Sequence, residues 1–234
     1  MKGSRLPSIK VKDLEMHYTE RGDGPTVIAL HAATVSGAAL GWLAGAVVHE
    51  GFNVVTPDLR GHGETPNPAP DLHLTRLVDD VLEFVYQLGR NPVHGMGYSL
   101  GGAVMLHAAH RQPDLFRSLV LLGASYRAPT EERLRRILGP VEQRPAVQQR
   151  VFDAGTGIVV GWDRPLEAFS NVVSPTLLIC GDRDEFNDPE DNLALYRTLP
   201  RAEALIVPNT DHLGLVRHPM VFHALLNFYG RVPR

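Results

Sequence analysis

Short, mostly apolar runs of strand length recur along this chain. They lie at Thr26–Leu30, Asn53–Thr56, Val93–Met96, Ser118–Leu122, Pro175–Cys180 and Ala204–Val207. Continuous apolar runs, as opposed to alternating ones, are typical of strands that are buried on both faces. The pattern therefore indicates a parallel sheet with helices packed on each side.

Helix-like segments separate these runs. Apolar residues recur at helical spacing from Leu77 to Leu88 and stop at Gly89, a residue suited to a helix end. Two short segments near the start, Ile9–Val11 and Met16–Thr19, predict an antiparallel ribbon at the sheet edge. The fold class is thus α/β, with a mostly parallel central sheet of about eight strands flanked by helices on both faces. Further helices are expected at Leu40–His49, Leu100–His110, Pro189–Leu199 and Met220–Tyr229.

The alternation breaks between Gly123 and Ser174, where no clear strand pattern is found. The stretch Arg127–Arg150 is polar, rich in arginine and partly helical, with Thr130 placed to cap a helix. We interpret residues 124–173 as a short helical lid over the strand ends. It divides a single core into a first part, 1–123, and a second part, 174–234.

Composition narrows the class of protein. The 234 residues suffice for one domain, and a formal net charge of −3 gives no reason to expect nucleic acid or an anionic membrane as partner. The one cysteine, Cys180, rules out an internal disulfide and fits a reducing compartment. No run has the length of a signal peptide or a membrane span, so we expect a cytoplasmic protein acting on a small molecule. No metal-ligand spacing or phosphate loop is found, and no cofactor is expected; the oligomeric state, including a homo-oligomer, stays open.

A serine lies in a glycine-rich turn between an expected strand and an expected helix. The motif is Gly97-Tyr98-Ser99-Leu100-Gly101-Gly102. A serine hydroxyl needs a base to become a nucleophile, so it must project clear of the backbone, and a tight turn achieves this only with small neighbours. The sequence therefore predicts that Ser99 is a nucleophile.

Four segments together carry a resemblance to a known family. The serine turn resembles the nucleophile elbow of the α/β-hydrolase fold superfamily, in its serine-nucleophile branch of esterases, lactonases and carbon–carbon bond hydrolases. The other three segments resemble its oxyanion loop, the loop after its fourth strand and its acid loop. They are Leu30-His31-Ala32-Ala33, Pro57-Asp58-Leu59-Arg60-Gly61-His62-Gly63 and Gly181-Asp182-Arg183-Asp184.

A catalytic triad of Ser99, Asp184 and His212 is expected. His212 follows the last expected strand, which places it at the same sheet edge as Ser99, and the order Ser–Asp–His is the one that this fold uses. Asp184 matches the position of the family's acid, whereas we expect Asp182 to brace its loop. The oxyanion hole implied by the resemblance comprises the backbone N–H groups of Ala33 and Leu100. Ala32 stands where many relatives carry glycine, so a positive φ there would strain the loop.

These features predict a serine esterase, a hydrolase of the carboxylic ester class. It would cleave a small to medium ester, lactone or thioester through an acyl-enzyme on Ser99. Two alternatives stay open: a carbon–carbon bond hydrolase or lyase with the same triad, and a non-catalytic ligand-binding member of the fold. Three aromatic residues are candidates for the substrate pocket, namely Trp42, Tyr98 and Trp162.

Overall fold

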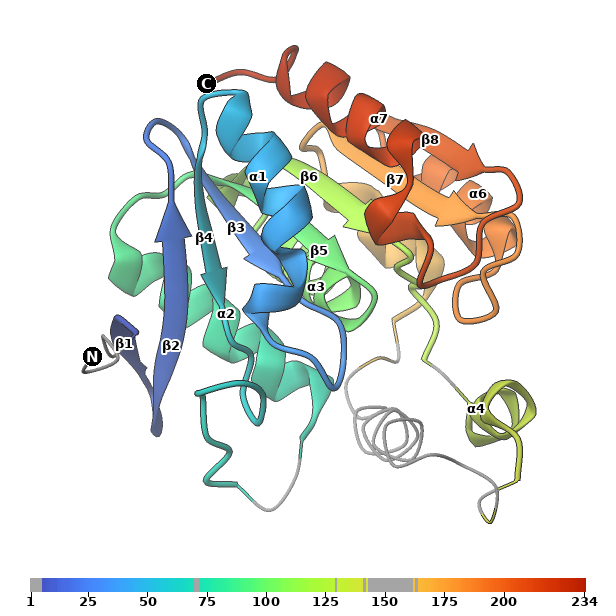
Figure 1. The fold of residues 1–234 in the computed structure, drawn as a ribbon, viewed down its shortest axis with the longest axis horizontal. Coiled ribbons are helices and arrows are strands. Elements are labelled where there is room, and N and C mark those ends of the chain that lie inside the picture. Colours follow the sequence, from blue (N-terminus) through green and yellow to red (C-terminus); the bar gives the residue numbers. More distant parts are fainter. Residues whose placement is uncertain (1–5, 70–71, 129, 141, 143–161, 163) are drawn as a thin grey trace.

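The computed structural model describes residues 6–69, 72–128, 130–140, 142, 162 and 164–234 (Figure 1). One sheet of eight strands, in the order β1-β2-β4-β3-β5-β6-β7-β8, runs through the centre. The first two neighbouring pairs are antiparallel and the remaining five are parallel, which confirms the expected sheet and its edge ribbon. The strands are β1 (Ser8–Val11), β2 (Leu14–Arg21), β3 (Thr26–Leu30), β4 (Asn53–Pro57), β5 (Val93–Tyr98), β6 (Phe116–Leu122), β7 (Thr176–Gly181) and β8 (Ala202–Val207).

Helices cover both faces of the sheet (Figure 1). Side chains of α1 (Gly41–His49) and α7 (Pro219–Tyr229) share one hydrophobic cluster with the sheet. Side chains of α2 (Leu74–Leu88), α3 (Leu100–Arg111) and α6 (Pro189–Thr198) share the other. Strands β3, β4, β5 and β7 are buried along their whole length, because both of their faces lie under helices.

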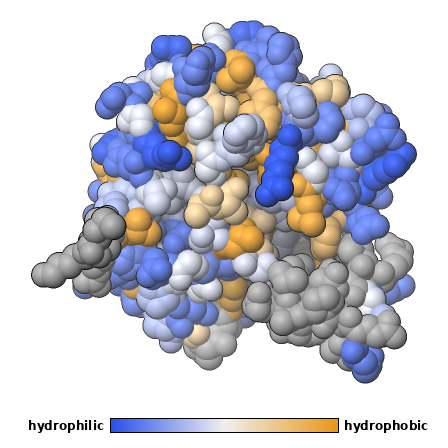
Figure 2. Space-filling view, in the orientation of Figure 1, coloured by the Kyte–Doolittle hydropathy of each residue, from blue (hydrophilic) through white to orange (hydrophobic). Residues whose placement is uncertain are grey.

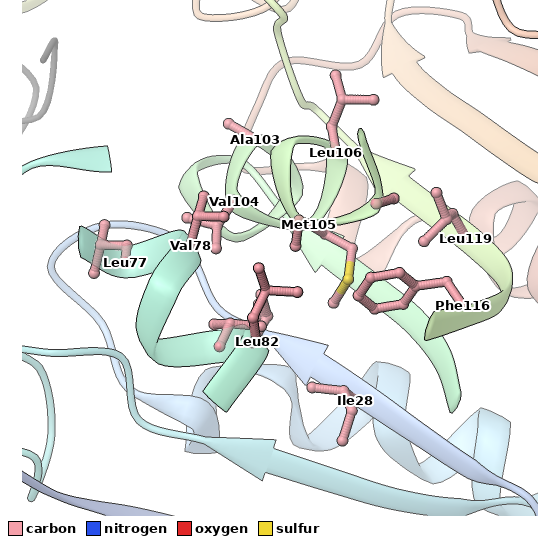
Figure 3. Packing of buried hydrophobic residues seen from close by; sticks show 14 of the residues in the cluster. Ile28, Leu77, Val78, Leu82, Ala103, Val104, Met105, Leu106, Phe116 and Leu119 are labelled. Atoms are coloured by element: carbon pink, nitrogen blue, oxygen red, sulfur yellow. The ribbon is translucent and has the colours of Figure 1, made fainter. Parts of the chain in front are cut away.

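The larger cluster shows why the apolar spacing of α2 predicted a helix. Its side chains Val78 and Leu82 point toward Met105 of α3, and Phe116 and Leu119 of β6 close the other side (Figure 3). The helix ends at Gly89, as expected, with a φ of +69°. On the outer surface, hydrophilic and hydrophobic residues are interspersed on the face shown in Figure 2.

The segment interpreted as a lid, 124–173, lies partly outside the described residues. Its described part contains α4 (Glu131–Leu138), which begins directly after Thr130 as expected, and the 3-10 turn η4 (Leu166–Asn171). Helix α4 lies apart from the two helical layers in Figure 1. The division into core and lid stays a prediction. Among the described residues, no helix combines the length and the apolarity needed to cross a bilayer.

Candidate active site

Ser99 occupies a sharp turn between β5 and α3. Its backbone has a φ of +55° and a ψ of −118°, a conformation that residues other than glycine rarely adopt. A Cβ on Gly101 would lie 2.3 Å from the carbonyl oxygen of Leu30, so only glycine lets the first turn of α3 approach the end of β3 this closely. The glycine in the motif is therefore a packing requirement of the turn that presents the Ser99 hydroxyl.

The structure brings the Ser99, His212 and Asp184 side chains together at the carboxyl edge of the sheet. The Nε2 atom of His212 lies 2.9 Å from Ser99 Oγ. On the other side of the ring, Nδ1 lies 2.9 and 2.8 Å from the two carboxylate oxygens of Asp184. A carboxylate only accepts hydrogen bonds, so Nδ1 carries the proton and Nε2 is left as an acceptor for the serine hydroxyl. The arrangement can remove a proton from Ser99.

The Asp184 carboxylate is held by its own loop. Its Oδ1 atom accepts hydrogen bonds from the backbone N–H groups of Phe186 and Asn187, each 2.9 Å long. Asp182 has the bracing role expected for it, because its carboxylate accepts from the N–H of Thr210 at 3.1 Å. The loop that carries His212 is thereby joined to the loop that carries Asp184.

Three neighbours fix the imidazole of His212. The Tyr98 ring stacks on it at a centroid distance of 5.1 Å, and the Tyr98 hydroxyl donates to the His212 carbonyl oxygen at 2.9 Å. Burial raises the pKa of this hydroxyl, which keeps it a neutral donor. The Phe186 ring also packs on the imidazole, with 4.9 Å between the two ring centroids. Beneath the ring, a Cβ on Gly123 would lie 2.9 Å from His212 Cε1. Sequence reasoning missed the parts played by Gly123 and Phe186, and no signal in the apolar pattern marks them.

The backbone positions expected to form the oxyanion hole flank the same turn. Leu100 is the first residue of α3, and Ala33 lies in the loop that follows β3. The strain anticipated at Ala32 is not found there, because the positive φ of this loop, +65°, falls on Thr34. Alanine at position 32 is therefore compatible with the loop.

The aromatic candidates for the pocket are placed differently from one another. Tyr98 packs on His212 as described, and its hydroxyl is taken up by the backbone. Trp42 is 67% exposed at the start of α1, with its ring 5.3 Å from that of Phe222 in α7. Trp162 is buried beside His107 of α3. Among the described residues, no hydrogen bond or ring contact joins either tryptophan to Ser99, Asp184 or His212.

Asp188 and three other histidines lie outside this arrangement. Asp188 caps α6 by accepting from the N–H of Glu190 at 3.0 Å. His94 lies buried in β5 with Nδ1 2.8 Å from Ser118 Oγ. His218 accepts from the N–H of Met220 at the start of α7, and His223 is exposed on that helix.

Comparison with known proteins places these features in context. Residues 25–152 match the family model described as the alpha/beta hydrolase fold. A putative carbamate hydrolase RutD from Agrobacterium fabrum is 35% identical over 112 residues, which cover 47% of this chain but only 42% of that protein. A 2-(acetamidomethylene)succinate hydrolase from Mesorhizobium japonicum is 23% identical over 94% of this chain and 93% of its own length. Among solved structures, an esterase from Exiguobacterium antarcticum superposes with a TM-score of 0.82 at 17% identity, covering 97% of this chain and all of that one (100%).

Proposed function

The chain belongs to the alpha/beta hydrolase family, and from this premise we propose that it is a serine hydrolase that forms an acyl-enzyme on Ser99. The observation that supports this most directly is the continuous hydrogen-bonded row from Ser99 Oγ through His212 to the Asp184 carboxylate. Nucleophile, base and orienting acid in contact are what covalent acyl transfer requires.

The first half of the proposed reaction forms the acyl-enzyme. Ser99 Oγ attacks the substrate carbonyl carbon while its proton passes to His212 Nε2. The carbonyl oxygen becomes an oxyanion, and the N–H groups of Ala33 and Leu100 stabilise it. The leaving group departs with the proton from Nε2, and the Asp184 carboxylate stabilises the imidazolium that exists in between.

The second half regenerates the enzyme. His212 Nε2 takes a proton from a water molecule, whose oxygen attacks the acyl carbon on Ser99. The bond from the acyl carbon to Oγ then breaks, Oγ regains a proton from Nε2, and a carboxylic acid leaves. The water supplies all the atoms that the products gain, and neither oxidant nor cofactor takes part in these steps.

We propose a small to medium carboxylic ester, lactone or thioester as substrate. The same chemistry also acts on carbonyl groups bonded to nitrogen, and the names of the two curated relatives, a carbamate hydrolase and a 2-(acetamidomethylene)succinate hydrolase, favour such a substrate as the second candidate. A panel of p-nitrophenyl esters, lactones, acyl thioesters, carbamates and acetamido compounds separates these classes by turnover. A ring-cleavage diketone in the same panel tests the carbon–carbon alternative.

Active-site labelling tests the proposal before any substrate is known. A fluorophosphonate probe should label the native chain and should fail to label Ser99→Ala. Ser170→Ala is the matched control, because Ser170 is exposed on η4 and its loss should leave labelling unchanged. If the folded native chain is not labelled, or if Ser99→Ala is labelled equally, the chain is a binding member of the fold and not a serine hydrolase.

A further inference from the structure

Both ring nitrogens of His31 are engaged by the backbone of two loops. His31 is fully buried at the end of β3. Its Nε2 atom accepts a hydrogen bond from the backbone N–H of Leu59 at 2.9 Å, and its Nδ1 atom lies 2.7 Å from the carbonyl oxygen of Ala32. An acceptor at Nε2 and a donor at Nδ1 define one neutral tautomer. Burial also lowers the pKa of His31 to about 4, so the neutral ring is the form present near neutral pH.

We propose that His31 is a positioning residue that sets the direction of the Ala33 N–H group, one of the two oxyanion donors. This inference rests on the proposed function. The Ala32 carbonyl and the Ala33 N–H belong to the same peptide group, and in a trans peptide they point to opposite sides of the chain. By holding the Ala32 oxygen on its own side, the His31 ring turns the Ala33 N–H away from itself.

The position of α3 places the second proposed oxyanion donor, the Leu100 N–H, near the Ala33 N–H. The first turn of α3 packs on the end of β3 so closely that a Cβ on Gly101 would lie 2.7 Å from the His31 carbonyl oxygen. The Leu100 N–H at the start of α3 therefore lies beside the loop that carries Ala33. Ala32 and Ala33 are half-buried, which leaves this backbone reachable by a substrate on Ser99.

The far side of the loop is pinned as well. The Asp58 carboxylate accepts a hydrogen bond from the Gly37 N–H at 2.7 Å and one from the Glu64 N–H at 2.9 Å. Between the two fixed points, the chain passes through the positive φ of Thr34. Ala32 and Gly37 are thus tied to the same neighbouring loop, which follows β4.

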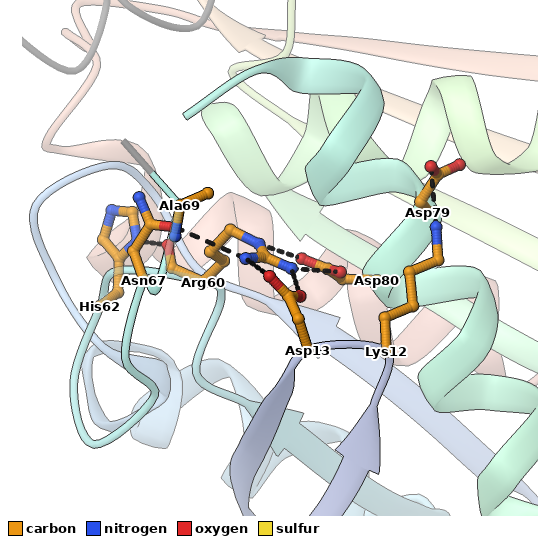
Figure 4. A network of polar contacts seen from close by, with 8 residues as sticks. All are labelled: Lys12, Asp13, Arg60, His62, Asn67, Ala69, Asp79 and Asp80. Carbon is orange, nitrogen blue, oxygen red and sulfur yellow. Dashed lines mark hydrogen bonds and ion pairs between the residues drawn. The ribbon is translucent and has the colours of Figure 1, made fainter. Parts of the chain in front are cut away.

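That neighbouring loop is itself anchored in the core (Figure 4). The Arg60 side chain is fully buried and donates to both carboxylate oxygens of Asp80 in α2, at 2.7 and 2.9 Å. It also donates to both oxygens of Asp13 in the turn between β1 and β2, at 3.2 and 2.6 Å. Leu59, which binds His31, directly precedes this anchor. The imidazole is therefore held against a rigid support, which positioning of the Ala33 donor requires.

Replacing the ring by the two amides separates its two hydrogen bonds. In His31→Asn, the amide nitrogen stands near the place of Nδ1 and keeps a donor for the Ala32 oxygen. In His31→Gln, the longer amide reaches the place of Nε2 and keeps a partner only for Leu59. A merely structural role predicts similar defects in both variants, whereas positioning of Ala33 predicts that asparagine is the better replacement.

Kinetics on an ester that the native chain turns over provide the main readout. We expect His31→Ala and His31→Gln to lower kcat by about 10²–10³ with little change in KM, the loss associated with one oxyanion donor. Affinity for a trifluoromethyl ketone should fall in parallel, and His31→Asn should retain most of both quantities. His94→Ala is the matched control: it removes an equally buried imidazole from β5 and should lower the melting temperature without this loss of kcat. Unchanged kcat in His31→Ala, or asparagine no better than glutamine, overturns the inference.

Crystal structures of His31→Ala and His31→Asn make the test independent of turnover. A rotated peptide between Ala32 and Ala33 in the alanine variant, restored in the asparagine variant, supports the inference even if fluorophosphonate does not label the native chain. An unrotated peptide in both overturns it even if labelling succeeds. Failure of the proposed function and failure of this inference are thus distinguished.

Discussion

Substitution of Gly123 by alanine should damage catalysis more than it damages stability. Gly123 follows β6 with a φ of +52°, and its missing side chain makes room for His212 and Asp184. An added Cβ would lie 2.9 Å from His212 Cε1, 3.1 Å from Nδ1 and 3.2 Å from Asp184 Oδ2. The first of these distances is one that carbon atoms essentially never adopt, so the imidazole must move.

Two effects of different size follow. The left-handed backbone costs an alanine residue about 1–2 kcal/mol relative to glycine, which lowers the free energy of unfolding. The displaced imidazole loses its alignment with Ser99 Oγ, and a misplacement of about 1 Å in a catalytic group lowers the rate by roughly 10²-fold. We therefore expect Gly123→Ala to remain folded near room temperature while its kcat falls by about two orders of magnitude.

Substitution of Gly89 is the control for the backbone effect alone. Gly89 ends α2 with a φ of +69°, and a Cβ placed on it meets no atom within 4 Å. Gly89→Ala should lose a similar amount of stability in urea denaturation and keep its kcat on the same ester. If both variants lose equal stability and Gly123→Ala also keeps native kcat, the position of the His212 imidazole does not depend on the absence of a side chain at position 123.

Three further predictions concern the core. Asp80→Asn removes one charge from a fully buried ion pair with Arg60 and should lower the free energy of unfolding by about 3–5 kcal/mol. The control is Asp79→Asn, which should lower it by less than about 1 kcal/mol because the Asp79 carboxylate is partly exposed. Equal losses for the two variants in urea denaturation would contradict this prediction. Burial lowers the pKa of three histidines from 6.5 to about 4, namely His31, His94 and His107. Between these two pKa values the unfolded chain binds more protons than the folded chain, so the free energy of unfolding should decrease by roughly 3 kcal/mol per histidine as the pH is lowered from about 7 to about 4. Urea midpoints that do not change over this pH range would refute the prediction. Burial raises the pKa of Cys180 to about 12, so iodoacetamide should modify it only after unfolding, as mass spectrometry would show.

The architecture could be predicted because burial on two faces leaves a local signature. Thr26–Leu30 is apolar at every position except its first, and β3 has those same bounds. The neighbourhood of Ser99, Asp184 and His212 could be predicted as well, since parallel strands deliver their following loops to one edge. Both inferences need only the order of elements and the direction of the strands.

Contacts between side chains from distant elements could not be predicted in this way. Tyr98 stacks on His212 across 114 positions, and Arg60 meets Asp13 across 47. Nothing in the local pattern of the sequence distinguishes a tyrosine that stacks on a distant histidine from one that lines a pocket. Backbone strain is equally hidden in the sequence, since the positive φ of the loop after β3 falls on Thr34, two residues after Ala32.

Because the backbone of Ser99 has a positive φ, one substitution there should remove activity and at the same time increase stability. Ser99→Gly removes the hydroxyl, but glycine adopts a φ of +55° without steric cost. Ser99→Ala removes the same hydroxyl and keeps the steric penalty of a Cβ at that φ. Of two equally inactive variants, the glycine form should therefore melt at the higher temperature. The difference between the two melting temperatures measures how much stability the chain loses by holding the residue that carries the Ser99 hydroxyl in this conformation.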